Sequence, residues 1–191
     1  KIKNFLIEKK KILISILGFI IILILSFYTH QMYKDNLRHN ISDKYNAAVI
    51  QYNNGNQQSS ILQMKEIVEN RDSSYSPLAL YFLIDNKLID NKNEVNEMFD
   101  VLIDKTSLQT EIKNLIIYKK ALYNSDFINE DELLDILRPI INSNSVWKSH
   151  ALYLLAEYFY SKDEKQKSKE FFNKIISLEN ANNDIAKEAQ K

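Results

Sequence analysis

The chain of 191 residues contains no cysteine, only two glycines and only two prolines. Without cysteine it has no disulfide and no thiolate nucleophile, and this absence is compatible with both oxidising and reducing compartments. β-Sandwiches and doubly wound α/β folds need many turn residues, yet beyond position 28 only Gly55, Pro77 and Pro139 are present. The composition therefore predicts an all-α fold.

Sequence motifs of catalytic and metal sites are also missing. The chain has no glycine-rich phosphate loop and no Gly-x-Ser-x-Gly elbow. Its histidines, His30, His39 and His150, lack metal-ligand spacing. Acidic pairs such as Glu130 and Asp131 stand where a helix N-terminus favours negative charge. We therefore expect no enzyme activity, metal, cofactor or small-molecule substrate.

Neither sign of charge is in excess, since 25 basic and 25 acidic residues give a formal net charge of zero. Five lysines and one glutamate fall within residues 1–11, which leaves 20 basic and 24 acidic residues, a net charge of about −4, for the rest. No basic face stands out in that remainder. We therefore expect no nucleic-acid partner.

One long hydrophobic run is present, the uncharged segment from Ile12 to Tyr28, and it directly follows three lysines at 9–11. As a helix it would measure roughly 26 Å, at the short end for a membrane span. It lacks the polar stripe of a core helix. The segment "SFYTHQMY", which begins within the run and continues past it, has bulky residues where a cleaved signal peptide has a small-x-small site. We interpret residues 12–28 as an uncleaved transmembrane helix.

The lysines also predict the orientation of this span. Because lysine-rich flanks stay in the cytoplasm, residues 1–11 are expected to form a cytoplasmic basic tail. The rest of the chain would then lie on the periplasmic side of a bacterial inner membrane. An organellar inner membrane of bacterial descent obeys the same rule and remains an alternative. Since the chain begins with Lys rather than Met, we expect a few residues to precede it.

Beyond the span, apolar residues recur with helical spacing. No strong breaker occurs between Tyr28 and Asn53, so the helix is predicted to run on through a stalk at 29–44. About eight short helices follow, with Gly55 in a left-handed turn. The predicted start and stop signals are Ser76 as an N-cap before Pro77, capping-box spacing at Thr106–Gln109 and at Asn129–Glu132, Pro139 ending or kinking a helix near Leu137, and Ser145 as an N-cap.

The stretch "LYLLAEYFYSKDEKQKSKEFFNKII" at 152–176 has the pattern of a helical hairpin. It places small residues where two helices would cross and large or aromatic residues on either side to fill the space. The stretch resembles a tetratricopeptide repeat, with Asp163 in the turn where glycine is usual. The residues of this pattern are Leu152, Leu155, Ala156, Phe159, Ser168, Phe172 and Ile175. The corresponding small or central positions of the four hairpins are Ala48, Ala79, Ile116 and Ala156.

We therefore expect a degenerate tetratricopeptide-like array of about four hairpins at 45–178. Residues 179–191 would form a polar joint and the start of a C-terminal helix. A plain helical bundle with coincidental spacing is the alternative.

A basic tail, one span and about four degenerate hairpins together resemble the YfgM-like family of ancillary Sec translocon subunits. The resemblance implies a scaffold that meets newly translocated chains or hands them to periplasmic chaperones. The expected partners are the Sec translocon, periplasmic chaperones and exported chains, with membrane contact through residues 12–28. The alternative is a structural subunit of a larger membrane complex that binds no client.

Tetratricopeptide-like arrays bind partners on a concave face formed by the first helix of each hairpin. Tyrosines there combine a large contact area with a polar tip. The resemblance predicts a partner-binding groove formed by Tyr45, Val49 and Tyr52 of the first hairpin and by His150, Tyr153, Glu157 and Tyr160 of the fourth. Packing between hairpins is the alternative role of each tyrosine.

Overall fold

A computed structural model describes residues 10–191, apart from the side chains at positions 10–14, 16, 17, 34, 35 and 37. All regular structure in this range is helical, which confirms the all-α prediction. The α-helices are α2 (Lys10–Asn53), α3 (Gln57–Glu69), α4 (Tyr75–Asp85), α5 (Lys92–Asp100), α6 (Thr110–Asn124), α7 (Glu130–Ile141), α8 (Lys148–Ser161), α9 (Lys165–Ile176) and α10 (Asn183–Glu188). A π-helical segment, η1 (Val101–Lys105), continues α5.

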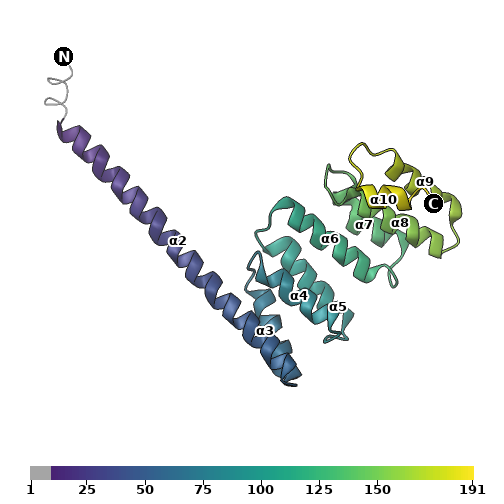
Figure 1. The fold of residues 1–191 in the computed structure, drawn as a ribbon, viewed down its shortest axis with the longest axis horizontal. Coiled ribbons are helices and arrows are strands. Elements are labelled where there is room, and N and C mark those ends of the chain that lie inside the picture. Colours follow the sequence, from purple (N-terminus) through teal and green to yellow (C-terminus); the bar gives the residue numbers. More distant parts are fainter. Residues whose placement is uncertain (1–9) are drawn as a thin grey trace, which may run out of the picture.

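Helix α2 is a single long helix that projects away from the other helices (Figure 1). As the lack of breakers predicted, it runs unbroken to Asn53, and its C-terminal part packs against α3 and α4. Among the residues that the structure describes, no helix is long and apolar enough to cross a membrane. The side chains at 12–14, 16 and 17 of the predicted span, and residues 1–9 of the predicted tail, lie outside that description.

The helices follow one another as hairpins in a linear array. Helix α2 pairs with α3, α4 with α5, α6 with α7, and α8 with α9 (Figure 1). Each hairpin also contacts the next one, through α3 and α4, through α5 and α6, and through α7 and α8. Helix α10 packs against α8 and α9. The pairing follows from short connections, which make consecutive helices neighbours in space.

Two clusters of buried apolar side chains hold the array together, and they meet at α6. The first cluster extends from Ala48 to Ile116, and the second from Ile117 to Phe159. Neighbouring residues of α6 thus serve different clusters, so this helix joins the two halves. The four positions singled out by the repeat pattern, Ala48, Ala79, Ile116 and Ala156, are all 0% exposed.

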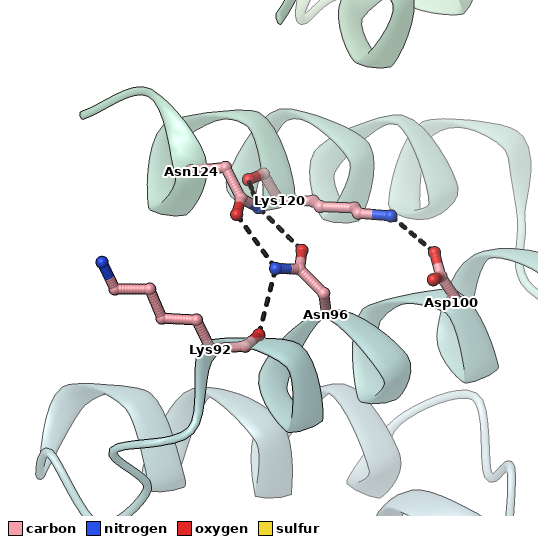
Figure 2. A network of polar contacts seen from close by, with 5 residues as sticks. All are labelled: Lys92, Asn96, Asp100, Lys120 and Asn124. Atoms are coloured by element: carbon pink, nitrogen blue, oxygen red, sulfur yellow. Dashed lines mark hydrogen bonds and ion pairs between the residues drawn. The ribbon is translucent and has the colours of Figure 1, made fainter. Parts of the chain in front are cut away.

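A polar network fastens α5 to α6 (Figure 2). The side-chain amides of Asn96 and Asn124 donate to each other's Oδ1 atoms at 2.9 and 2.8 Å. Beside this pair, Lys120 Nζ donates to Asp100 Oδ1 at 2.5 Å. Because Asn124 is only 5% exposed, its amide depends on these partners rather than on water.

Three of the four hairpin turns contain a residue in the left-handed region. They are Gly55 with φ of 84°, Lys87 with φ of 52° and Asp163 with φ of 61°. Gly55 thus adopts the conformation predicted for it. Asp163, which replaces the usual glycine, adopts it as well, because a short polar side chain tolerates this region better than most.

The local helix signals were predicted with mixed success. The capping box of Asn129 and Glu132 is confirmed, with 3.0 Å for each of its two hydrogen bonds. The assignment of Ser76 as an N-cap is wrong. Its hydroxyl donates to the Ile67 carbonyl at 2.6 Å, while Asp72 accepts the N–H groups that begin α4. Burial and a long-range acceptor therefore outweigh the local capping preference of Ser76.

Three further signals were displaced or overridden. The Thr106–Gln109 capping box is wrong, since the Thr106 hydroxyl donates back to the Val101 carbonyl and α6 begins only at Thr110. Pro139 does not end its helix near Leu137, because it lies exposed in the last turn and costs α7 one terminal hydrogen bond. The predicted N-cap at Ser145 is displaced, because α8 begins at Lys148 and Trp147 is its N-cap residue. The Ser145 hydroxyl instead accepts the Trp147 N–H just before the helix.

Candidate interaction groove

A groove with a volume of about 670 Å³ lies along α4 and α6, bordered by α2 and by the segment before α6. Apolar side chains and hydroxyl groups line it, and Arg38 is the single charged residue among them. The lining residues are Arg38, Ser73, Ser74, Pro77, Leu78, Tyr81, Ser107, Leu108, Gln109, Ile112, Leu115 and Ile116.

The apolar character of the groove follows from the sequences of its two helices. Helix α4 is apolar on almost every side, so it buries Ala79, Leu80 and Leu83 in the core and still presents Leu78 outward. In α6, Ile116 is buried while Ile112, one turn earlier, remains outside. Leu78 is 46% exposed and Ile112 is 40% exposed. Two large apolar side chains therefore face solvent across the same hollow.

Arg38 borders the groove from the side of α2. Its Nη2 atom donates to Ser74 Oγ at 2.6 Å, and it forms no ion pair with any residue the structure describes. One turn along α2, Ser42 Oγ accepts the Tyr75 hydroxyl at 2.8 Å. These two bonds attach α2 to the beginning of α4 and hold the guanidinium group at the edge of the groove.

Tyr81 lines the groove and has an unusual hydroxyl group. The oxygen is buried and has no hydrogen-bond partner in the described part of the chain. Burial, with a smaller contribution from the negative charge of Asp85, raises the pKa of Tyr81 to about 12. Lys119 Nζ lies 5.7 Å from the ring centroid, within reach of a cation–π interaction. Tyr81 therefore contributes its ring to the groove wall, while its hydroxyl oxygen is buried.

The segment that leads into α6 leaves backbone groups free. Between residues 106 and 110 the chain is not helical, and the N–H groups of Ser107, Leu108 and Gln109 donate to no described residue. Gln109 precedes α6 in an extended conformation, and its side chain does not cap the helix. One edge of the groove thus carries unpaired backbone donors next to the open N-terminus of α6.

The residues predicted from the first hairpin lie against α4. The ring of Tyr45 lies 5.8 Å from that of Tyr75 and 6.4 Å from that of Phe82, and Tyr52 lies 5.2 Å from Phe82. Val49 is half-buried against the same cluster. Burial also raises the pKa of Tyr45. These contacts match the alternative that the sequence left open, which is packing between hairpins.

The residues predicted from the fourth hairpin have mixed surroundings. His150 lies 5.1 Å from Trp147 and 5.9 Å from Tyr118, ring to ring. Its Nδ1 atom is buried, and burial lowers the pKa of His150, an effect that a hydrogen bond with the Val146 backbone partly offsets. Tyr153 packs 5.6 Å from Phe172, and burial raises its pKa, with the charge of Glu157 adding to the effect.

Glu157 and Tyr160, in contrast, are exposed on α8, and Tyr160 is 62% exposed. The predicted residues therefore form two sets, on the first and the fourth hairpin, and these hairpins lie at different ends of the array (Figure 1). The groove itself is formed mainly by the second and third hairpins, which sequence reasoning passed over. The signal that could have revealed it was an apolar residue outside the buried stripe of each first helix, at Leu78 and Ile112.

Among the side chains that the structure describes, no group of three or more histidines, aspartates or glutamates could hold a metal ion. Comparison of the chain with protein-family models, with curated proteins and with solved structures gives no match.

Proposed function

We propose that this protein is a membrane-tethered protein-interaction scaffold with a tetratricopeptide-like domain. In this proposal residues 12–28 span the inner membrane, the N-terminus is cytoplasmic and the array lies in the periplasm. There it assists Sec-dependent export or hands exported proteins to chaperones. The observation that carries the proposal is the open groove along α4 and α6, which is attached to the same long helix that contains the apolar run.

The tether is supported by the exposure of the apolar run. The large apolar side chains from Phe19 to Leu25, together with Phe27 and Tyr28, are between 45% and 68% exposed on all sides of α2. A helix with apolar side chains all round suits lipid rather than water. The basic residues before the run support the orientation.

The structural-subunit alternative also has an observation in its favour. Tyr45 and Tyr52, which were expected to face a client, pack against Phe82 inside the array. If the groove were filled permanently by a neighbouring subunit, the domain would serve assembly rather than client capture. The two alternatives differ in the number of partners that the groove binds: several for a scaffold, and a single one for a structural subunit.

Photocrosslinking in intact cells separates them. A benzoylphenylalanine would replace Leu78 or Ile112 in the groove, with Leu62 of α3, 59% exposed and outside the groove, as the matched control. The scaffold predicts adducts with translocon subunits, chaperones or exported chains from the groove positions and not from Leu62. A single stoichiometric membrane partner, trapped equally from all three positions, would instead identify a structural subunit.

A further inference from the structure

Resting on the proposed scaffold function, we propose that the groove along α4 and α6 binds an extended, apolar polypeptide segment that carries an acidic side chain, and that Arg38 pairs with this acid. The proposal names the class of partner. It depends on three features of the groove: its exposed apolar lining, its free backbone edge and its single positive charge.

The lining selects apolar side chains. Leu78 and Ile112 remain 46% and 40% exposed, and the half-buried Leu108 and Leu115 add apolar surface to the lining. Covering these side chains removes apolar area from water, which is the main driving force of association. A volume of about 670 Å³ accommodates several side chains of a bound segment.

The backbone edge selects an extended segment over a helix. The N–H groups of Ser107, Leu108 and Gln109 donate to no described residue, and all three residues line the groove. A helix pairs its own carbonyl groups except those of its last turn, whereas an extended chain presents free carbonyls along its length. An extended segment therefore suits this edge of the groove better than the side of a helix does.

The charge selects an acidic residue in that segment. Arg38 is the single charged residue in the lining, and its guanidinium group is held in place by Ser74 while it lacks an ion pair with any described residue. A positioned guanidinium group without an ion pair is complementary in charge and hydrogen-bond geometry to a carboxylate.

The position of Arg38 argues for a polypeptide rather than a lipid headgroup. At a rise of about 1.5 Å per residue, Arg38 lies roughly 15 Å along α2 from Tyr28, where the proposed span ends. The headgroup layer extends only about 5–8 Å beyond the hydrocarbon on each side. An acidic lipid would therefore have to leave the bilayer to reach the groove.

Competitive peptide capture tests this inference on the full chain in nanodiscs. The probe is an equimolar mixture of two nonapeptide pools with Leu, Ile, Val or Ser at the variable positions and either Glu or Gln at the centre. Peptides retained above empty nanodiscs are counted by mass spectrometry. For the native chain we expect the Glu pool to be enriched about two- to fivefold, the range of a partly exposed ion pair.

The variants assign the binding to the groove. Arg38→Gln should retain peptides but bring the ratio of Glu to Gln pools to about one. Ile112→Asp should lose both pools, while Leu62→Asp, the matched exposed position on α3, should change neither amount nor ratio. Circular dichroism melting establishes that each variant is folded.

Equal retention of both pools by the native chain would overturn the role of Arg38, and undiminished retention by Ile112→Asp would overturn the site. If no peptide is retained while Leu78 still yields adducts with several partners in cells, the extended-segment inference fails and the scaffold proposal stands. If the adducts are also absent, the proposed function fails with it. Vesicles of acidic lipid serve as a second probe. If the chain retains these vesicles and no peptides, the groove is a lipid site and the inference is likewise overturned.

Discussion

At the scale of single residues, two tyrosines of α4 differ in the surroundings of their hydroxyl groups. Tyr75 donates to Ser42 Oγ at 2.8 Å, whereas the hydroxyl of Tyr81 is buried without a partner among the described residues. A buried polar group without a partner loses its hydrogen bonds to water and gains nothing in return. The hydroxyl of Tyr81 thus lowers the stability of the domain, whereas the hydroxyl of Tyr75 raises it.

This contrast predicts opposite effects of the same substitution. Tyr81→Phe should raise the free energy of unfolding by about 1 kcal/mol, because it removes the unpaired hydroxyl. Tyr75→Phe, the matched control on the same helix, should lower it by about 0.5–1.5 kcal/mol. Urea denaturation of the full chain, followed by circular dichroism, measures both. A loss of stability in Tyr81→Phe would mean that the hydroxyl has a partner after all.

The raised pKa of Tyr81 also predicts a pH dependence. Between pH 10 and 12 the unfolded chain loses the phenolic proton while the folded chain retains it, so the folded state binds more protons and stability falls as pH rises. Relative to its value below pH 10, the stability falls by at most about 2–3 kcal/mol once the pH has passed the folded pKa. Tyr81→Phe should therefore lose less stability over this range than the native chain. Parallel pH curves would contradict the assignment.

At the scale of the elements, the hairpin turns show where the sequence departs from ideal turn chemistry. Lys87 adopts φ of 52° in the turn after α4, a conformation in which a β-carbon is strained. Gly55 adopts a similar conformation without that strain. The second hairpin therefore stores strain that the first one avoids.

Replacing Lys87 with glycine should relieve this strain. We expect Lys87→Gly to raise the free energy of unfolding by about 0.5–1 kcal/mol, and Lys87→Ala, which keeps the β-carbon, to leave it nearly unchanged. The reverse change, Gly55→Ala, should cost about 1 kcal/mol. Thermal melting of the three variants checks the prediction. A stabilising Lys87→Ala would show that charge rather than φ decides the effect.

The amide pair between α5 and α6 predicts a strong coupling between two helices (Figure 2). Asn96→Ala or Asn124→Ala leaves the other amide short of a partner and should cost about 1–3 kcal/mol. The double substitution should cost clearly less than the sum, with a coupling energy of about 0.5–3 kcal/mol in a double-mutant cycle. Additive losses would mean that the two amides act independently.

Local patterns predicted elements whose signals are short-range. The capping box at Asn129 and the left-handed turn at Gly55 depend on neighbouring residues, and both are present. Ser76 has the same local preference for a cap, but its hydroxyl is used by the Ile67 carbonyl from another helix. Nothing in the residues around Ser76 encodes that contact, so the sequence placed the start of α4 too late.

The candidate site was harder to predict than the fold, for a related reason. Periodicity identifies which face of a helix is buried, and the stripe of Tyr45 and Tyr52 was offered as a binding surface. In the folded chain this stripe packs against Phe82, while the open groove lies on α4 and α6. Which apolar face stays uncovered depends on how successive hairpins stack, and that is a property of tertiary structure.

At the scale of the whole molecule, a long helix and a hairpin array form one connected body. Helix α2 belongs to the first hairpin, and Arg38 and Ser42 bond it to α4, so its orientation is coupled to that of the groove. If α2 is anchored in a membrane, the groove is held at a defined height above the surface. Because the proposed partners are exported chains and periplasmic chaperones, the proposed function requires the array to lie on the periplasmic side of the membrane.

Labelling of a single introduced thiol measures this directly, because the chain has no cysteine of its own. Lys162→Cys places a thiol at the exposed end of α8, and Lys3→Cys places one in the basic tail. In intact spheroplasts, a membrane-impermeant maleimide should label the Lys162→Cys variant at once and the Lys3→Cys variant only after lysis. Labelling of Lys162→Cys only after lysis would put the array in the cytoplasm and contradict the account.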